Sequence, residues 1–222
     1  MIYQILNTGV AVMVIATLLS LSFLLPEREG FFTSDAAKTK KFLNIFSIAW
    51  FLTAILNFVS QLARIFEESM LEVLNLTVLQ SFATQVTLGK LLSFQIVSVL
   101  VIIVFNSRVK KNGGALWLLF IALSGFVAPV FQSHSSALGS HGLAIGSLVI
   151  HVVGLSFWIG SVLALLLMSV QVREFALSRV SNISLWSSSA VVLSGVMNAW
   201  TRLRLSQDWF TSYGALIFLK IA

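Results

Sequence analysis

The interpretation of this chain starts from residues Gln132–Met168, QSHSSALGSHGLAIGSLVIHVVGLSFWIGSVLALLLM. The stretch lies within a longer run, Asn112–Val172, that contains no Lys, Arg, Asp or Glu. Such a run is typical of a membrane interior, where inserting a charged side chain costs about 2.5–3.5 kcal/mol. All three histidines of the chain, His134, His141 and His151, fall inside it. Titratable or metal-binding groups at such a place are candidates for function.

The composition of the whole chain points the same way. Of its 222 residues, 58% are hydrophobic and 10% are charged, whereas soluble domains carry about 25% charged residues. The net charge of +6 does not indicate a nucleic-acid partner, because the basic residues lie in short loops between apolar runs. The chain has no cysteine, which excludes disulfides and thiolate metal sites. The sequence therefore predicts an integral protein of the lipid bilayer.

The apolar runs predict an all-α fold, a polytopic transmembrane helical bundle. Each span needs about 20 apolar residues. Six full spans are expected at about residues 2–25, 42–63, 88–105, 115–131, 142–171 and 183–203, and a seventh starts near Tyr213. The mixed polarity of residues 71–87 predicts an interfacial helix and a turn.

The distribution of Lys and Arg predicts the orientation. Loops 26–41, 106–114 and 172–182 carry nine basic residues, against four in the loops and span ends of the other side. Because cytoplasmic loops are enriched in Lys and Arg, the N-terminus is expected outside the cell membrane. The loop SHSSALGSH, which has no basic residue, is expected on the outside as well.

A weak internal repeat suggests how the spans are organised. Span two ends with Asn57, Gln61 and Arg64, and span six ends with Asn198, Arg202 and Arg204. The repeat predicts a first four-helix membrane unit over 1–131 and a second, truncated unit over 132–222. The ten residues from Tyr213 to Ala222 cannot cross a hydrocarbon core of about 30 Å at 1.5 Å per residue. We therefore expect the chain to be a fragment of a longer protein.

The three histidines and Met197 form a candidate metal pathway. Imidazole is the commonest protein ligand for transition metals, and thioether sulfur selects Cu(I). His141 and His151 are about 15 Å apart along a straight helix, too far to share one ion. The expected depths form a ladder, with His134 and His141 at the outer mouth, Met197 about 7 Å deep and His151 about 14 Å deep. Single soft ligands in series suit an ion that moves inward by ligand exchange.

Purely structural interpretations stand beside this hypothesis. Histidines in a Ser/Gly loop are often simply solvated, and Met197 is of a type that most often only packs. His151 shares a helix face with Gly154 and Trp158, and this face continues as small residues. Gly154 lets a neighbouring helix approach closely. The face is therefore expected to pack against another helix first and to form a site second.

Short motifs in the second half of the chain resemble a known family. The segment from His151 to Gly160, with Trp158 between them, is similar to the H-x6-W-x-G helix of the CopD family of copper-resistance membrane proteins. The loop SHSSALGSH resembles the small-residue histidine loop that precedes that helix. Residues Thr211, Tyr213, Gly214, Leu216 and Lys220 resemble the start of a further helix of the family. The resemblance is strongest over residues 130–222 and rests on the layout of spans before that.

The resemblance implies a protein that handles copper. It implies copper uptake across the cytoplasmic membrane or delivery toward oxidase assembly, with a periplasmic or extracellular copper-binding protein or an assembly factor as partner. Two alternatives remain open: a haem b electron-transfer protein with His151 and Met197 as axial ligands, and a membrane assembly subunit without a ligand. No enzyme is expected, since the spans hold no nucleophile–base–acid set and no HExxH motif.

Overall fold

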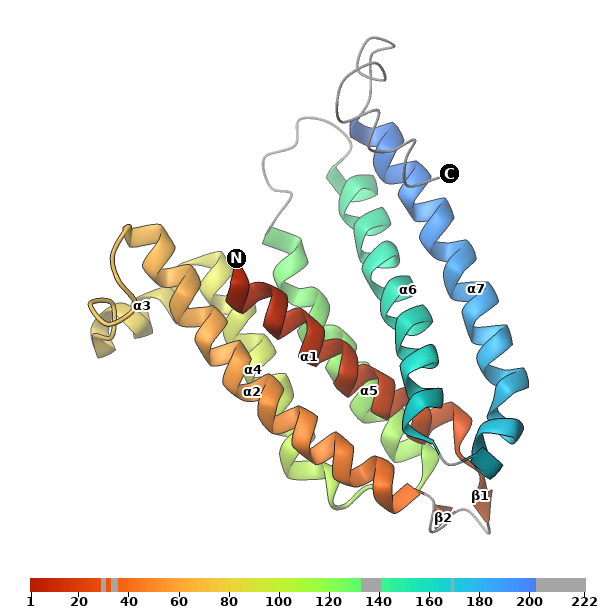
Figure 1. Cartoon of the computed structure of the whole chain (residues 1–222). Helices are drawn as coiled ribbons and strands as arrows, with labels where there is room; N and C mark the ends of the chain where they lie inside the picture. Colours follow the sequence, from red (N-terminus) through yellow and green to blue (C-terminus); the bar gives the residue numbers. More distant parts are fainter. Residues whose placement is uncertain (29–30, 33–35, 133–140, 169, 203–222) are drawn as a thin grey trace.

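The computed structural model describes residues 1–28, 31–32, 36–132, 141–168 and 170–202 (Figure 1). The helices are α1 (Ile2–Leu19), continued by a π-helical turn η1 (Ser20–Leu24); α2 (Ala36–Phe66); α3 (Leu76–Gln85); α4 (Thr87–Asn106); α5 (Asn112–Val127), continued by a 3-10 turn η2 (Ala128–Gln132); α6 (His141–Leu167); and α7 (Val170–Arg202). Two short strands, β1 (Glu27–Arg28) and β2 (Phe31–Phe32), form an antiparallel hairpin.

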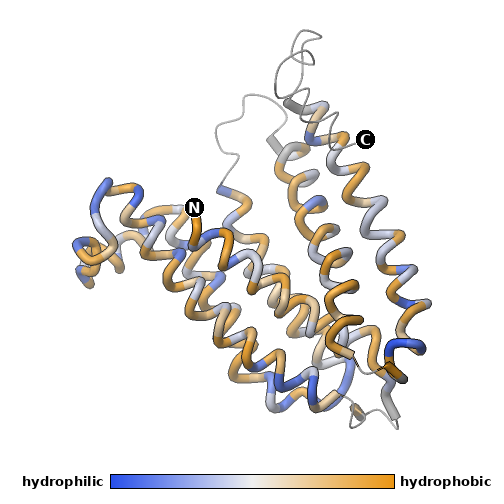
Figure 2. Tube along the Cα trace, in the orientation of Figure 1, coloured by the Kyte–Doolittle hydropathy of each residue, from blue (hydrophilic) through white to orange (hydrophobic). Residues whose placement is uncertain are grey.

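Six of the described helices are long and apolar enough to cross a bilayer, which confirms the predicted all-α, polytopic bundle. They comprise α1 with η1, α2, α4, α5 with η2, α6 and α7. Figure 2 shows that hydrophobic residues dominate the middle of the bundle and that hydrophilic residues gather toward the helix ends and the α3 region. The predicted seventh span lies outside the described residues.

The helices α1, α2, α4 and α5 pack as a ring, in which α1 contacts α2 and α5, and α4 contacts the same two helices. Trp50, Leu43 and Ile15 are fully buried in the core of this ring. The short helix α3 folds back against α4. A Cβ atom on Gly89 would collide with the backbone carbonyl group of Phe82, so the approach requires a residue without a side chain.

Helices α6 and α7 form a hairpin beside the ring, with α6 resting on α1 and α7 packed mainly against α6 (Figure 1). The contact of α6 with α1 is close at Gly160, where a Cβ atom would lie 3.0 Å from Leu19. The division of the chain into units 1–131 and 132–222 stays a prediction, because residues 203–222 lie outside the described part of the chain.

The structure corrects the boundary of the sixth span. Residues 172–182, expected as a loop, are helical, because α7 begins at Val170. The guanidinium group of Arg173 donates to the carbonyl oxygens of Leu165 and Met168, at 3.1 and 3.4 Å, and so caps the end of α6. Arg179 donates to the carbonyl oxygen of Phe23 at 2.9 Å. Arg173 and Arg179, whose charges suggested a loop, therefore donate hydrogen bonds to backbone carbonyl oxygens at the ends of neighbouring helices.

Candidate functional site

The side chain of His151 lies at the interface between α6 and α7. Its Nδ1 atom is 3.0 Å from the carbonyl oxygen of Val191 and 3.1 Å from the hydroxyl oxygen of Ser194. The residue is partly buried in the middle of α6. The imidazole also packs over Gly195, where a Cβ atom would lie 3.5 Å from the Cε1 atom of His151. One residue of α6 is thus held by three neighbours on α7.

These contacts fix the tautomer of His151. A carbonyl oxygen only accepts hydrogen bonds, so Nδ1 carries a proton that it donates to Val191. Ser194 donates its own hydroxyl proton to carbonyl oxygens of α7, which leaves the hydroxyl oxygen able to accept from Nδ1. In a neutral imidazole the lone pair then lies on Nε2. Histidines that bind metals commonly have this arrangement, with the second ring N–H donated to a backbone carbonyl.

Small and polar residues bring α6 and α7 close together around His151. A Cβ atom on Gly154 would lie 3.0 Å from the Val191 side chain and 3.2 Å from the carbonyl oxygen of Ser187. On the other side of His151, the hydroxyl of Ser147 donates to the side-chain oxygen of Asn198 at 2.9 Å. This face was predicted to pack against another helix, and the structure places α7 against its Gly154 end. Gly160 of the same predicted face lies against α1, and Trp158 is 42% exposed.

The other three predicted ligands are less defined. His134 lies outside the described residues, and His141 is the first residue of α6. Because α6 is one continuous helix from His141 to Leu167, His141 and His151 are separated by ten residues of helix, about 15 Å. Met197 is 45% exposed and follows Ser194 by three residues on α7. Within the described ranges, no three His, Cys, Asp or Glu residues are placed to hold one metal ion.

A polar cavity lies on the other side of α6, and sequence reasoning did not identify it. Its volume is about 420 Å³, and it lies between α1, α2, α4, η2 and α6. Three buried amides, Asn7, Asn57 and Gln95, contribute to its lining. Val152, the neighbour of His151, lines it from α6. The sequence does contain a signal for this cavity, namely single amide residues inside apolar runs. Burying a polar group within a membrane span costs free energy, so such residues indicate a partner or a function.

Hydrogen bonds connect the amides of this cavity. Asn7 donates to the side-chain oxygen of Gln95 at 3.0 Å, and Gln95 donates to the carbonyl oxygen of Gly125 at 3.2 Å. Gln61 donates to the side-chain oxygen of Asn57 at 3.5 Å. The side-chain oxygen of Asn7 is buried and has no hydrogen-bond partner in the described part of the chain. The sequence singled out Asn57 and Gln61 only as members of the internal repeat.

Comparison with known proteins gives one family. A family model described as copper resistance protein D-like, N-terminal domain, matches residues 7–144, more than half of the chain. No curated protein and no solved structure matches the chain. The matched range includes His134 and His141 and ends before His151. It therefore covers the first part of the chain, whereas the motifs that resemble the family lie in residues 130–222. The chain, whose described residues include six candidate membrane spans, belongs to the copper resistance protein D-like family.

Proposed function

We propose that this protein moves copper ions across the cytoplasmic membrane, or delivers them within it, through single ligands that open to the outside. The observation that carries the proposal is the state of His151. Its Nδ1 atom is bound to the carbonyl oxygen of Val191 at 3.0 Å, which leaves Nε2 as the nitrogen available to a metal. In a neutral imidazole with this proton on Nδ1, Nε2 carries the lone pair with which histidine binds transition metals. A polar residue inside a membrane span is a candidate for function.

In this proposal copper is cargo, and no reaction is catalysed. His134 and His141 capture the ion at the outer end, Met197 is an intermediate station, and His151 is the deep ligand. The thioether of Met197 favours Cu(I) over Cu(II). A periplasmic or extracellular copper-binding protein supplies the ion, or an oxidase-assembly factor receives it. Single ligands favour transfer because no closed site retains the ion.

A haem b between α6 and α7 is less well supported. The two helices approach so closely at Gly154 that even an added Cβ atom would lie 3.0 Å from Val191. Helices α6 and α7 would have to move apart to hold the haem macrocycle between them. Met197, the second axial ligand in that alternative, is 45% exposed. A visible spectrum of the purified protein without Soret absorption excludes haem.

The decisive experiment is His151→Ala, measured as copper accumulation in cells with equal amounts of the protein in the membrane. We expect accumulation to fall to the level of cells without the protein, while the variant stays inserted. His134→Ala/His141→Ala is expected to weaken accumulation at low copper and to recover partly at high copper. If the His151→Ala variant accumulates copper like the wild type, the ladder is wrong and His151 is a packing residue.

A further inference from the structure

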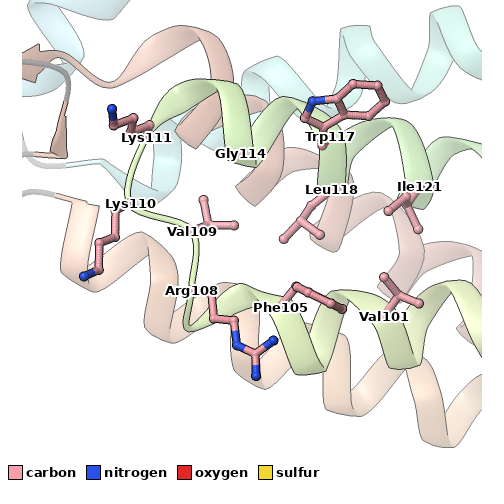
Figure 3. A pocket seen from close by; sticks show the side chains of 10 residues that line it. All are labelled: Val101, Phe105, Arg108, Val109, Lys110, Lys111, Gly114, Trp117, Leu118 and Ile121. Atoms are coloured by element: carbon pink, nitrogen blue, oxygen red, sulfur yellow. The ribbon is translucent and has the colours of Figure 1, made fainter.

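An apolar groove runs along the bundle between α4 and α5, and His151 is not among the residues that line it. Its volume is about 570 Å³. Figure 3 shows Val101 and Phe105 of α4 opposite Leu118 and Ile121 of α5. Trp117, at the rim, is 71% exposed. Both helices are candidate spans, so the groove faces the hydrocarbon region of the bilayer. A guest in this part of the groove is therefore an alkyl chain.

Cations gather at one end of the groove. Arg108, Lys110 and Lys111 contribute to its lining where α4 leads into α5 (Figure 3). None of the described residues that line it is acidic. The N-terminus of α5, which carries the positive end of the helix dipole, lies at the same end. The groove thus combines an apolar channel with a strongly positive mouth.

The positive end is held in place by contacts from two other elements. The ammonium group of Lys40 on α2 donates to the carbonyl oxygen of Val109 at 2.7 Å, which adds a further cation beside the loop. The backbone N–H of Phe32 donates to the carbonyl oxygen of Lys110 at 3.1 Å. The guanidinium group of Arg108 lies 5.2 Å from the ring centre of Phe105. These contacts hold the backbone that carries the cations at this end of the groove.

We propose that this groove is a binding site for an anionic phospholipid, whose phosphate lies at Arg108, Lys110 and Lys111 and whose acyl chain lies between α4 and α5. Arg and Lys bind phosphate oxygens through charge-assisted hydrogen bonds, and basic pockets between membrane helices bind anionic head groups. A zwitterionic lipid fills the apolar part equally well and gains less from the cations. Free phosphate gains nothing from the apolar part. The proposal does not depend on copper transport.

The test uses the purified protein in vesicles of phosphatidylcholine that contain brominated phosphatidylglycerol or brominated phosphatidylcholine. Bromine on an acyl chain quenches tryptophan at short range, and the contribution of Trp117 is the difference between the wild type and Trp117→Phe. We expect Trp117 to be quenched at a much lower fraction of brominated phosphatidylglycerol than of brominated phosphatidylcholine. Equal quenching by the two lipids overturns the proposal, and this comparison within the wild type depends on no charge variant.

A pair of matched variants locates the head group. Arg108→Gln/Lys110→Gln removes two cations of the groove, and Lys38→Gln/Lys41→Gln removes two exposed cations of α2 that do not line it. The first variant is expected to lose about 25-fold in apparent affinity for phosphatidylglycerol, since each such cation contributes about fivefold. The control is expected to lose little. If both variants lose the same affinity for phosphatidylglycerol, the lipid is attracted by the whole basic surface and the proposed site is wrong. If inorganic phosphate alone stabilises the protein, the ligand of the site is not a lipid.

Discussion

The side-chain amide of Asn7 on α1 donates to the side-chain oxygen of Gln95 on α4, at 3.0 Å. Gln95 in turn donates its side-chain amide to the carbonyl oxygen of Gly125 on α5, at 3.2 Å. Asn7 is 5% exposed and Gln95 is 1% exposed, so both amides are buried where the helices meet. Three helices of the ring are thereby joined beside the polar cavity. The bonds fix which faces of α1 and α4 are turned toward each other across the ring.

A double-mutant cycle on this pair measures its contribution to stability. We expect Asn7→Ala and Gln95→Ala each to lower the free energy of unfolding, with a coupling of about 0.6 kcal/mol, the average for hydrogen bonds between membrane helices. Gln95→Ala is expected to cost more than the coupling, because it leaves the amide of Asn7 unpaired and buried. Gln80→Ala, on the exposed face of α3, serves as the control. A coupling of zero contradicts the bond.

The approach of α7 to α6 is tested at Gly154. A Cβ atom there would lie 3.2 Å from the backbone carbonyl oxygen of Ser187, which cannot move without α7. Gly154→Ala is therefore expected to destabilise the hairpin by about 1–3 kcal/mol, as overpacking does in protein cores. Gly146→Ala, on the same helix and with nothing within 4 Å of the added atom, is the matched control. Thermal unfolding that is equal for the two variants refutes the close contact.

Cysteine labelling tests the predicted orientation, because the natural chain has no cysteine. Ser136→Cys, in the histidine loop, is expected to react with an impermeant thiol reagent in intact cells. Ser107→Cys, at the end of α4 beside the basic loop, is expected to react only after lysis. The physical reason is the excess of Lys and Arg in cytoplasmic loops. The opposite pattern places the N-terminus in the cytoplasm.

The spans could be predicted from the sequence because membrane insertion depends on local apolar length. That rule fails at residues 172–182, where charges lie on helix α7 and satisfy the carbonyl groups of other elements, as Arg179 does for Phe23. The polar cavity was not predictable in the same way. Asn7 and Gln95 are 88 residues apart, and their pairing depends on how the spans pack.

The candidate metal site was predictable in part. The sequence singled out His151 as a polar residue inside a span and Gly154 as a point of close approach. It gave no reason to expect that Val191 would fix the protonation of Nδ1, since a backbone carbonyl within a regular helix carries no sequence signal. Arg108, Lys110 and Lys111 entered the sequence argument as topology signals, and only their position at the end of an apolar groove suggests a ligand.

The orientation of His151 is tested at Gly195, its packing partner on α7. A Cβ atom on Gly195 would lie 3.5 Å from Cε1 and 3.7 Å from Nδ1 of His151, which is ordinary van der Waals contact. Gly195→Ala is therefore expected to keep copper accumulation near the wild-type level. Gly195→Leu places further atoms where the imidazole now lies, so it is expected to turn the ring away from Val191 and to reduce accumulation as far as His151→Ala does.

Gly146→Leu is the matched control for this series, because it introduces the same side chain on the same hairpin with nothing within 4 Å of its Cβ atom. Each variant is compared at equal amounts of protein in the membrane, so that a loss of copper accumulation is not a loss of folded protein. If the position of the imidazole matters, only Gly195→Leu loses accumulation. If Gly195→Leu accumulates copper as the wild type does, the imidazole position set by Val191 and Gly195 has no part in copper transfer.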